Sequence, residues 1–118
     1  MGDISKHFFR AEFACNCGCG QDTVDVELIT VLERLRTHYD SVIVINSGNR
    51  CEIYNKKIGG SKNSQHVKSR AADTVVKGVK PEKVQEQVNE WYPGRYGIGS
   101  YTTFTHIDTR GYRARWSG

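Results

Sequence analysis

Two histidines and an aspartate have the residue types and the surroundings of metal ligands. His66 and Asp73 lie in one segment, and His106 lies near the C-terminus in Phe-Thr-His-Ile-Asp. Two imidazoles and one carboxylate suit Zn²⁺, and three protein ligands leave a fourth position open for water. Asp73 also precedes an apolar run, where burying an unpaired carboxylate would cost free energy that a metal would offset. These residues therefore predict one catalytic zinc ion.

Asp108 is the candidate for the general base that such a site needs. In a strand, side chains alternate between faces, so His106 and Asp108 point to the side of Phe104, whereas Thr105 and Ile107 point to the other. A carboxylate placed there either activates the water or orients His106 through the ring nitrogen that faces away from the metal. The sequence leaves both roles open.

Four cysteines form a second group, at positions 15, 17, 19 and 51. Only Cys15 and Cys19 have the spacing of a structural zinc knuckle. A disulfide from one of the first three cysteines to Cys51 fits a protein that works outside the cytoplasm. Four reduced thiols are the third alternative, and the spacing does not choose among the three.

The elements that position these residues follow from the hydrophobic periodicity. Residues 24–39 are predicted to form an amphipathic helix, and residues 41–46 a buried strand. A short helix is expected over residues 51–58, because two glycines follow it. A polar loop then leads to His66.

The second half of the chain mixes strands and helices in the same way. Residues 70–76 are predicted to form a strand, Pro81 begins a second helix, and strands follow over 95–101 and 103–109. This order favours a compact α+β fold, a small antiparallel sheet flanked by helices, over a doubly wound parallel sheet. At 118 residues, we expect a single domain over residues 1–118.

Composition excludes several classes of protein. No apolar run is long enough for a transmembrane helix, so we expect no membrane insertion. The net charge of +4 is mild, and no basic stripe is interleaved with aromatic residues, so we expect no nucleic-acid partner. A basic nucleic-acid binder built on the cysteines is kept as an alternative. The N-terminus is too polar for a secretory signal, and we expect a monomer.

Four segments resemble motifs of the D-Ala-D-Ala carboxypeptidase and VanX/VanY-type zinc peptidases, and they follow one another along the chain in the same order as in that family. Residues 64–73 are similar to the family's Ser-x-His-x6-Asp signature, and residues 47–50 to its Ser-Gly-Tyr-Arg segment. Residues 54–60 match its Asn-x-x-Val/Ile-Gly-Gly. Residues 104–108 resemble the last motif of a small branch found in phage and bacterial cell-wall enzymes. The resemblance covers nearly the whole chain.

The resemblance implies a Hedgehog/DD-peptidase-like fold and a zinc peptidase that cuts a D-amino-acid-containing bond in a peptidoglycan peptide. It implies that Arg50 is both catalytic and substrate-binding, because its planar guanidinium suits a carboxylate or a carbonyl oxygen. Ser64 either contacts the substrate near the metal or shapes its loop. Tyr101 either donates to an oxyanion or packs at the rim.

Three positions depart from the family's pattern. Asn49 stands where the family has Tyr, Ser69 where it has Gly, and Thr103 where many relatives carry the catalytic carboxylate. The missing carboxylate leaves an alternative, a non-catalytic zinc-bearing module that binds the cell wall. We expect action on the cell wall, by a phage lysin or virion component made in the host cytoplasm, or by a domain of a longer secreted protein. Carboxypeptidase and endopeptidase activities stay open.

Overall fold

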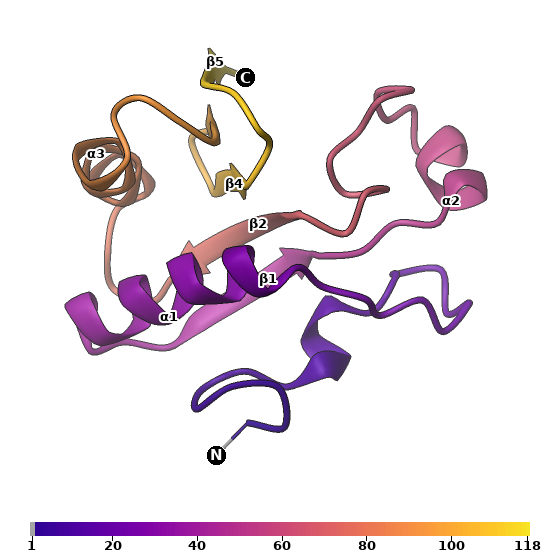
Figure 1. Ribbon diagram of the computed structural model, residues 1–118, viewed down its shortest axis with the longest axis horizontal. Coiled ribbons are helices and arrows are strands. Elements are labelled where there is room, and N and C mark those ends of the chain that lie inside the picture. Colours follow the sequence, from indigo (N-terminus) through magenta and orange to yellow (C-terminus); the bar gives the residue numbers. More distant parts are fainter. Residues whose placement is uncertain (1) are drawn as a thin grey trace.

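The computed structural model describes residues 2–118, which form one five-stranded sheet with helices packed against it (Figure 1). The strand order is β1-β2-β4-β3-β5. The strands are β1 (Ile43–Ser47), β2 (Ala71–Val76), β3 (Gly97–Ser100), β4 (Thr105–Asp108) and β5 (Ala114–Ser117). The helices are the 3-10 helix η1 (Arg10–Phe13) and the α-helices α1 (Val26–Tyr39), α2 (Glu52–Lys57) and α3 (Pro81–Trp91).

The predicted α+β class is confirmed, and the expected helices and strands form close to their predicted bounds. The small sheet is antiparallel, as predicted, except at one pairing. The strand β5, which was not predicted, pairs in parallel with β3. Its four residues, Ala-Arg-Trp-Ser, include a charged and a polar side chain, so the segment lacks the apolar run that signals a buried strand.

One face of the sheet is covered by α1 and α3, and the hydrophobic core lies between them and the sheet (Figure 1). The amphipathic stripe of each helix supplies the buried side chains, because removing apolar surface from water is the main favourable term in folding. The core residues at this layer include Leu28, Leu32, Leu35, Val84, Val88, Ala72, Ile98 and Ile107.

The helix ends have local causes. Asp40 ends α1 in a left-handed conformation with φ of 46°, which is a common way for a helix to stop. Pro81 occupies the first turn of α3, as the sequence predicts, because that position needs no backbone N–H donor. No helix in residues 2–118 has the length and apolar character needed to cross a membrane.

The opposite face of the sheet carries a row of directly paired residues, one from each strand. Ser47 pairs with Asp73, Asp73 with His106, His106 with Gly99, and Gly99 with Trp116. Paired residues point to the same face of a sheet, so the register gathers side chains from distant parts of the chain. Gly99 has no side chain where the Trp116 ring approaches, and a Cβ there would collide with that ring.

Candidate metal centre

The three predicted metal ligands meet on this row. Nε2 of His66 lies 3.3 Å from Oδ1 of Asp73, and Nδ1 of His106 lies 3.0 Å from the same oxygen. Asp73 and His106 come from the paired strands β2 and β4, and His66 comes from the loop before β2. One ligand atom from each residue lies within 4.8 Å of the others. The structure therefore brings together the residues that the sequence singled out.

The far nitrogen of each imidazole is held by an acceptor. Nδ1 of His66 donates to the carbonyl oxygen of Gly48 at 2.8 Å, and Nε2 of His106 donates to Oδ2 of Asp108 at 2.7 Å. Because these partners only accept, the far nitrogen of each ring carries a proton, and the near nitrogen points at Asp73. Histidines that bind metals are oriented in this way.

The hydrogen bonds around Asp73 keep its carboxyl group ionised. Burial opposes ionisation of Asp73, but hydrogen bonds from His106 and His66 outweigh it and hold the pKa of that carboxyl well below its usual range. Burial likewise disfavours the charged form of His106, yet Asp108 and Asp73 raise its pKa. Two imidazole nitrogens and an ionised oxygen thus converge, and this donor set fits Zn²⁺.

Asp108 lies behind His106 and is fully buried. Arg110 donates to both of its carboxylate oxygens, Nε to Oδ1 at 2.8 Å and Nη2 to Oδ2 at 2.7 Å. Burial opposes ionisation, but Arg110 and His106 together hold the pKa of Asp108 well below its usual range. The sequence correctly placed Asp108 on the face of His106, and these contacts favour the orienting role over the role of base.

Arg50 is held at the edge of the centre by neighbours from β1 and α2. Its Nε donates to Oγ of Ser47 at 3.3 Å, and its Nη1 donates to Oδ1 of Asn55 at 3.2 Å. Its Nη2 lies 3.6 Å from Oδ2 of Asp73. The guanidinium is therefore fixed beside the ligands, with donors left to face a bound molecule.

The segment 54–60 explains how Arg50 keeps its position. Asn55 is buried and its Nδ2 donates to the carbonyl oxygen of Ser61 at 2.8 Å, so one side chain joins Arg50 to the loop that leads to His66. Gly60 passes so close to Asn55 that a Cβ would overlap its side chain. The glycine is needed for this close approach.

Two of the departures from the resembled pattern contact each other. Nδ2 of Asn49 donates to Oγ of Ser69 at 2.8 Å and to the carbonyl oxygen of Thr23 at 3.0 Å. Ser69 has φ of 64°, in the left-handed region that favours glycine. The serine thus accepts an unfavourable backbone conformation and gains a hydrogen bond that a glycine lacks.

The centre opens into a cavity of about 840 Å³. Three cationic side chains reach its wall, those of Arg50, Lys68 and Arg110, and Asp73 is the one carboxylate among the described residues that line it. The predicted Ser64 and Tyr101 also line this cavity. Thr103, by contrast, is exposed on the turn between β3 and β4 and is not part of the wall.

Contacts within the cavity show what Ser64 and Tyr101 do locally. Oγ of Ser64 accepts a hydrogen bond from the backbone N–H of His66 at 3.2 Å, which fixes the loop. The ring of Tyr101 stacks on Phe104 at 4.4 Å, and its hydroxyl accepts from Nε1 of Trp116 at 3.1 Å. These contacts support the loop-shaping and packing roles.

Two cavity residues were missed by the sequence reasoning. The ring of Trp116 lies 5.0 Å from that of His106 and lines the cavity. Arg110 also lines the cavity, and its guanidinium lies over the Trp116 ring at 5.1 Å. A signal existed for Arg110, because alternate positions on an extended segment place it on the face of His106 and Asp108.

Comparison with protein families agrees with this geometry. A family model described as Peptidase M15 matches residues 6–108. The chain belongs to the peptidase M15 family. Nothing matches it among the curated proteins or the solved structures that were compared. In this M15 peptidase, the matched range contains His66, Asp73 and His106. Membership makes the chain a metallopeptidase by family, with a peptide as the class of substrate.

Proposed function

We propose that this protein hydrolyses a peptide bond next to a D-amino acid in a peptidoglycan stem or cross-link. One zinc ion would be held by His66, Asp73 and His106. The observation that carries the proposal is the convergence of their near donor atoms on one point, while acceptors fix the far nitrogen of each imidazole. Such orientation is typical of metal ligands.

A Zn²⁺ ion bound there supplies a Lewis acid that polarises a carbonyl group and activates a water molecule. The chain's own groups do the positioning. The Gly48 carbonyl and Asp108 keep the donor nitrogens aimed at the centre, and Arg110 keeps Asp108 ionised. We assign Asp108 to holding His106 rather than to the role of base, because its carboxylate is buried and fully engaged.

The charges of the cavity support an anionic substrate. Arg50, Lys68 and Arg110 line it, and peptidoglycan stems carry free carboxylates that such groups bind. We propose that Arg50 anchors a substrate carboxylate or carbonyl oxygen beside the metal, since Ser47 and Asn55 fix its guanidinium in place. We place the activity at the cell wall and expect the protein to act as a monomer.

One observation favours a second candidate function. Asp73 is the one carboxylate among the described cavity residues, and Thr103 stands exposed where many relatives carry the catalytic carboxylate. A zinc-bearing module that binds cell-wall peptides without cleaving them would need no base. Both candidates use the same metal centre, so only turnover separates them.

Digestion of purified sacculi tests both candidates. The zinc-loaded protein is incubated with sacculi, and the soluble products are identified by mass spectrometry, which also names the bond that is cut. We expect newly released amines and muropeptides with the wild type and none with His66→Ala, which removes a metal ligand. Binding to sacculi without any release, in protein shown to contain zinc, would reject the peptidase and support the binding module.

A further inference from the structure

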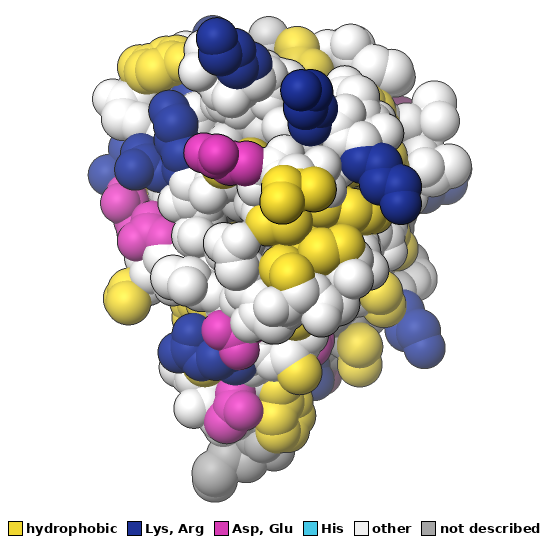
Figure 2. Space-filling model, turned by 90° about the vertical axis from the view of Figure 1, so that its right-hand side faces the viewer, with side chains coloured by type: hydrophobic (Ala, Val, Ile, Leu, Met, Phe, Trp, Pro, Cys, Tyr) yellow, Lys and Arg dark blue, Asp and Glu magenta, His cyan; other side chains and the backbone are white. Residues whose placement is uncertain are grey.

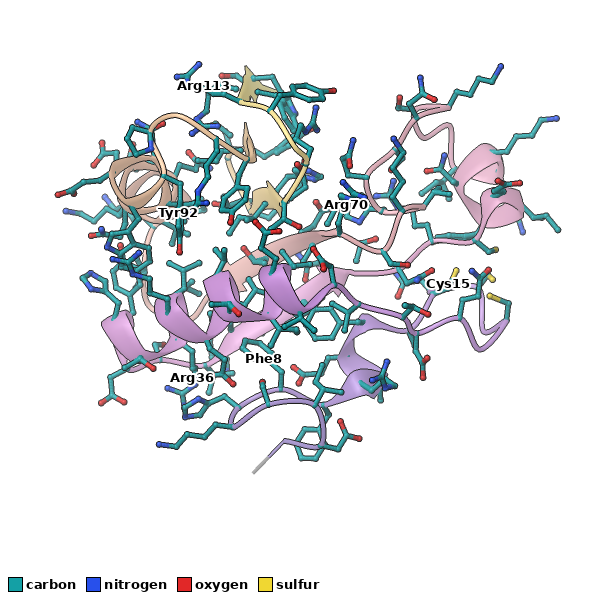
Figure 3. All side chains as sticks on the ribbon, viewed as in Figure 1. Phe8, Cys15, Arg36, Arg70, Tyr92 and Arg113 are labelled. Atoms are coloured by element: carbon teal, nitrogen blue, oxygen red, sulfur yellow. The ribbon has the colours of Figure 1, made fainter. Side chains whose placement is uncertain are left out.

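We propose that Cys15, Cys17, Cys19 and Cys51 bind a second zinc ion, which is structural. All four sulfur atoms lie within 4.8 Å of one another. The first three come from the loop after η1, and Cys51 comes from the residue before α2. Figure 3 shows sulfur atoms gathered beside the labelled Cys15, where this loop meets α2. The site is separate from the His66 centre and uses none of its residues.

The distances between sulfurs fit one tetrahedral ion. Sγ of Cys15 lies 3.4 Å from that of Cys17 and 3.9 Å from that of Cys51, and the Cys17 and Cys51 sulfurs are 3.7 Å apart. Four sulfurs about 2.3 Å from a zinc ion lie about 3.8 Å from each other, because that is the edge of the tetrahedron. Disulfides would instead draw the sulfurs together in two bonded pairs.

The backbone is shaped for thiolate ligands. The N–H of Cys51 points at the Cys15 sulfur at 3.4 Å, and the N–H of Tyr54 points at the Cys51 sulfur at 3.3 Å. Such donors stabilise negative charge on sulfur, as partners around a metal site do. Gly18 and Gly20 adopt φ of 80° and 91°, which lets the loop turn back so that alternate cysteines face one point.

The position of the cysteine cluster lets an ion enter from solvent and lets it join two segments of the chain. Cys17 and Cys19 are exposed, on the side of the molecule that carries α2. Figure 2 views that side, where hydrophobic side chains, coloured yellow, gather in the middle. The cluster joins the N-terminal loop to the residue next to Arg50. An ion there would fasten residues 14–21 to the turn that supplies Arg50 and the Gly48 carbonyl.

Metal content in variants tests the proposal independently of peptidase activity. Protein is purified under reducing conditions, and its metals are counted by mass spectrometry. We expect about two zinc ions per chain in the wild type and about one in His66→Ala/His106→Ala, since each centre holds one ion. Cobalt replacing that remaining zinc should give a sulfur-to-cobalt charge-transfer band in the near ultraviolet.

The double variant Cys17→Ser/Cys19→Ser should lose the zinc ion of the cysteine cluster. The charge-transfer band of its cobalt-substituted form should be weaker than that of the wild type. Both side chains are exposed, so circular dichroism should show a folded protein. Asn16→Ala is the matched control, because it removes the hydrogen bond from Asn16 to the Asn46 carbonyl but no sulfur, and it should keep about two ions. Disulfides in freshly purified wild type, iron in place of zinc, or unchanged zinc in the cysteine variant would each overturn the proposal.

Discussion

The His66 centre and the cysteine cluster both gather metal-binding side chains, but they are built in opposite ways. The histidines and Asp73 are anchored on or beside paired central strands, mix nitrogen with oxygen, and face a cavity. The cysteines lie on loops, offer four sulfurs, and leave no position for a substrate. Three ligands with an open side suit catalysis, whereas four suit structure.

The two centres differ in what fixes the positions of their ligand atoms. Strand register fixes Asp73 opposite His106 before any ion binds, so the geometry of the proposed catalytic centre belongs to the sheet. The cysteine loop has no strand to hold it, and a metal would have to supply that order itself. The two centres meet at the turn over residues 48–51, which carries Gly48, Arg50 and Cys51.

Increasing concentrations of a chelator should remove the two zinc ions one after the other. The resulting loss of peptide hydrolysis is the largest effect that we expect. The ion with three protein ligands should leave first, so peptide hydrolysis should fall by about a thousandfold, given that metal activation is worth several kcal/mol. The thermal midpoint should fall only at higher chelator concentration, when the four thiolates lose their ion. Activity and midpoint are measured across one chelator series, and added zinc is the control. Simultaneous loss of both would show that the centres are not independent.

Asp108→Asn should loosen the catalytic centre and leave the cysteine cluster intact. Losing the carboxylate that orients His106 and pairs with Arg110 should weaken zinc binding at this centre by about 10–100-fold, with partial loss of turnover. Zinc affinity and turnover are measured together. Gly97→Ala is the matched variant, because its Cβ would displace the Asp108 carboxylate without changing charge. Unchanged zinc affinity with complete loss of turnover would instead assign Asp108 as the base.

Glu33 provides an attachment of the N-terminal segment that needs no metal. Its carboxylate accepts from the Ser5 hydroxyl at 2.5 Å and from the backbone N–H of His7 at 2.7 Å. Burial opposes ionisation, but the bonds from Ser5 and His7 lower the pKa of Glu33. Glu33→Gln should cost about 1 kcal/mol at neutral pH, less than loss of the cysteine-bound ion, and should spare both metals.

The pH dependence of this effect has a definite sign. A carboxyl whose pKa is lowered by folding stabilises the protein above its unfolded value, and that contribution disappears as the pH falls through the folded value. The difference in unfolding free energy between wild type and Glu33→Gln should therefore shrink below about pH 4.3. Denaturant unfolding of both proteins across pH measures it. A difference that grows in acid would contradict the assigned contacts.

Ser69→Gly should have the smallest effect, near the catalytic centre but outside it. Glycine relieves the left-handed backbone of Ser69, while the hydrogen bond from Asn49 is lost. These terms oppose each other, so the free energy of unfolding should change by less than about 1 kcal/mol. Zinc content should not change. A large loss of stability would mean that the contact between Asn49 and Ser69 holds the loop before Asp73.

The helices and strands could be predicted because their burial repeats along the chain. The apolar stripes of α1 and α3 are local patterns, and each indicates which side of the helix faces the core. The strand β5 carries Arg115 and Trp116 in place of an apolar run, so the pattern that marks a strand is missing there. Its parallel pairing with β3 depends on the path of the chain, about which local periodicity says nothing.

The sequence by itself determined the peptidase M15 family and the donor types of the proposed catalytic centre, because the order of motifs along the chain can be recognised without a structure. It also placed Asp108 on the face of His106. Only the tertiary structure decided that the Trp116 ring lies beside His106 and that four cysteines converge. Those contacts depend on strand register and loop closure, which bring together residues that no spacing along the chain relates.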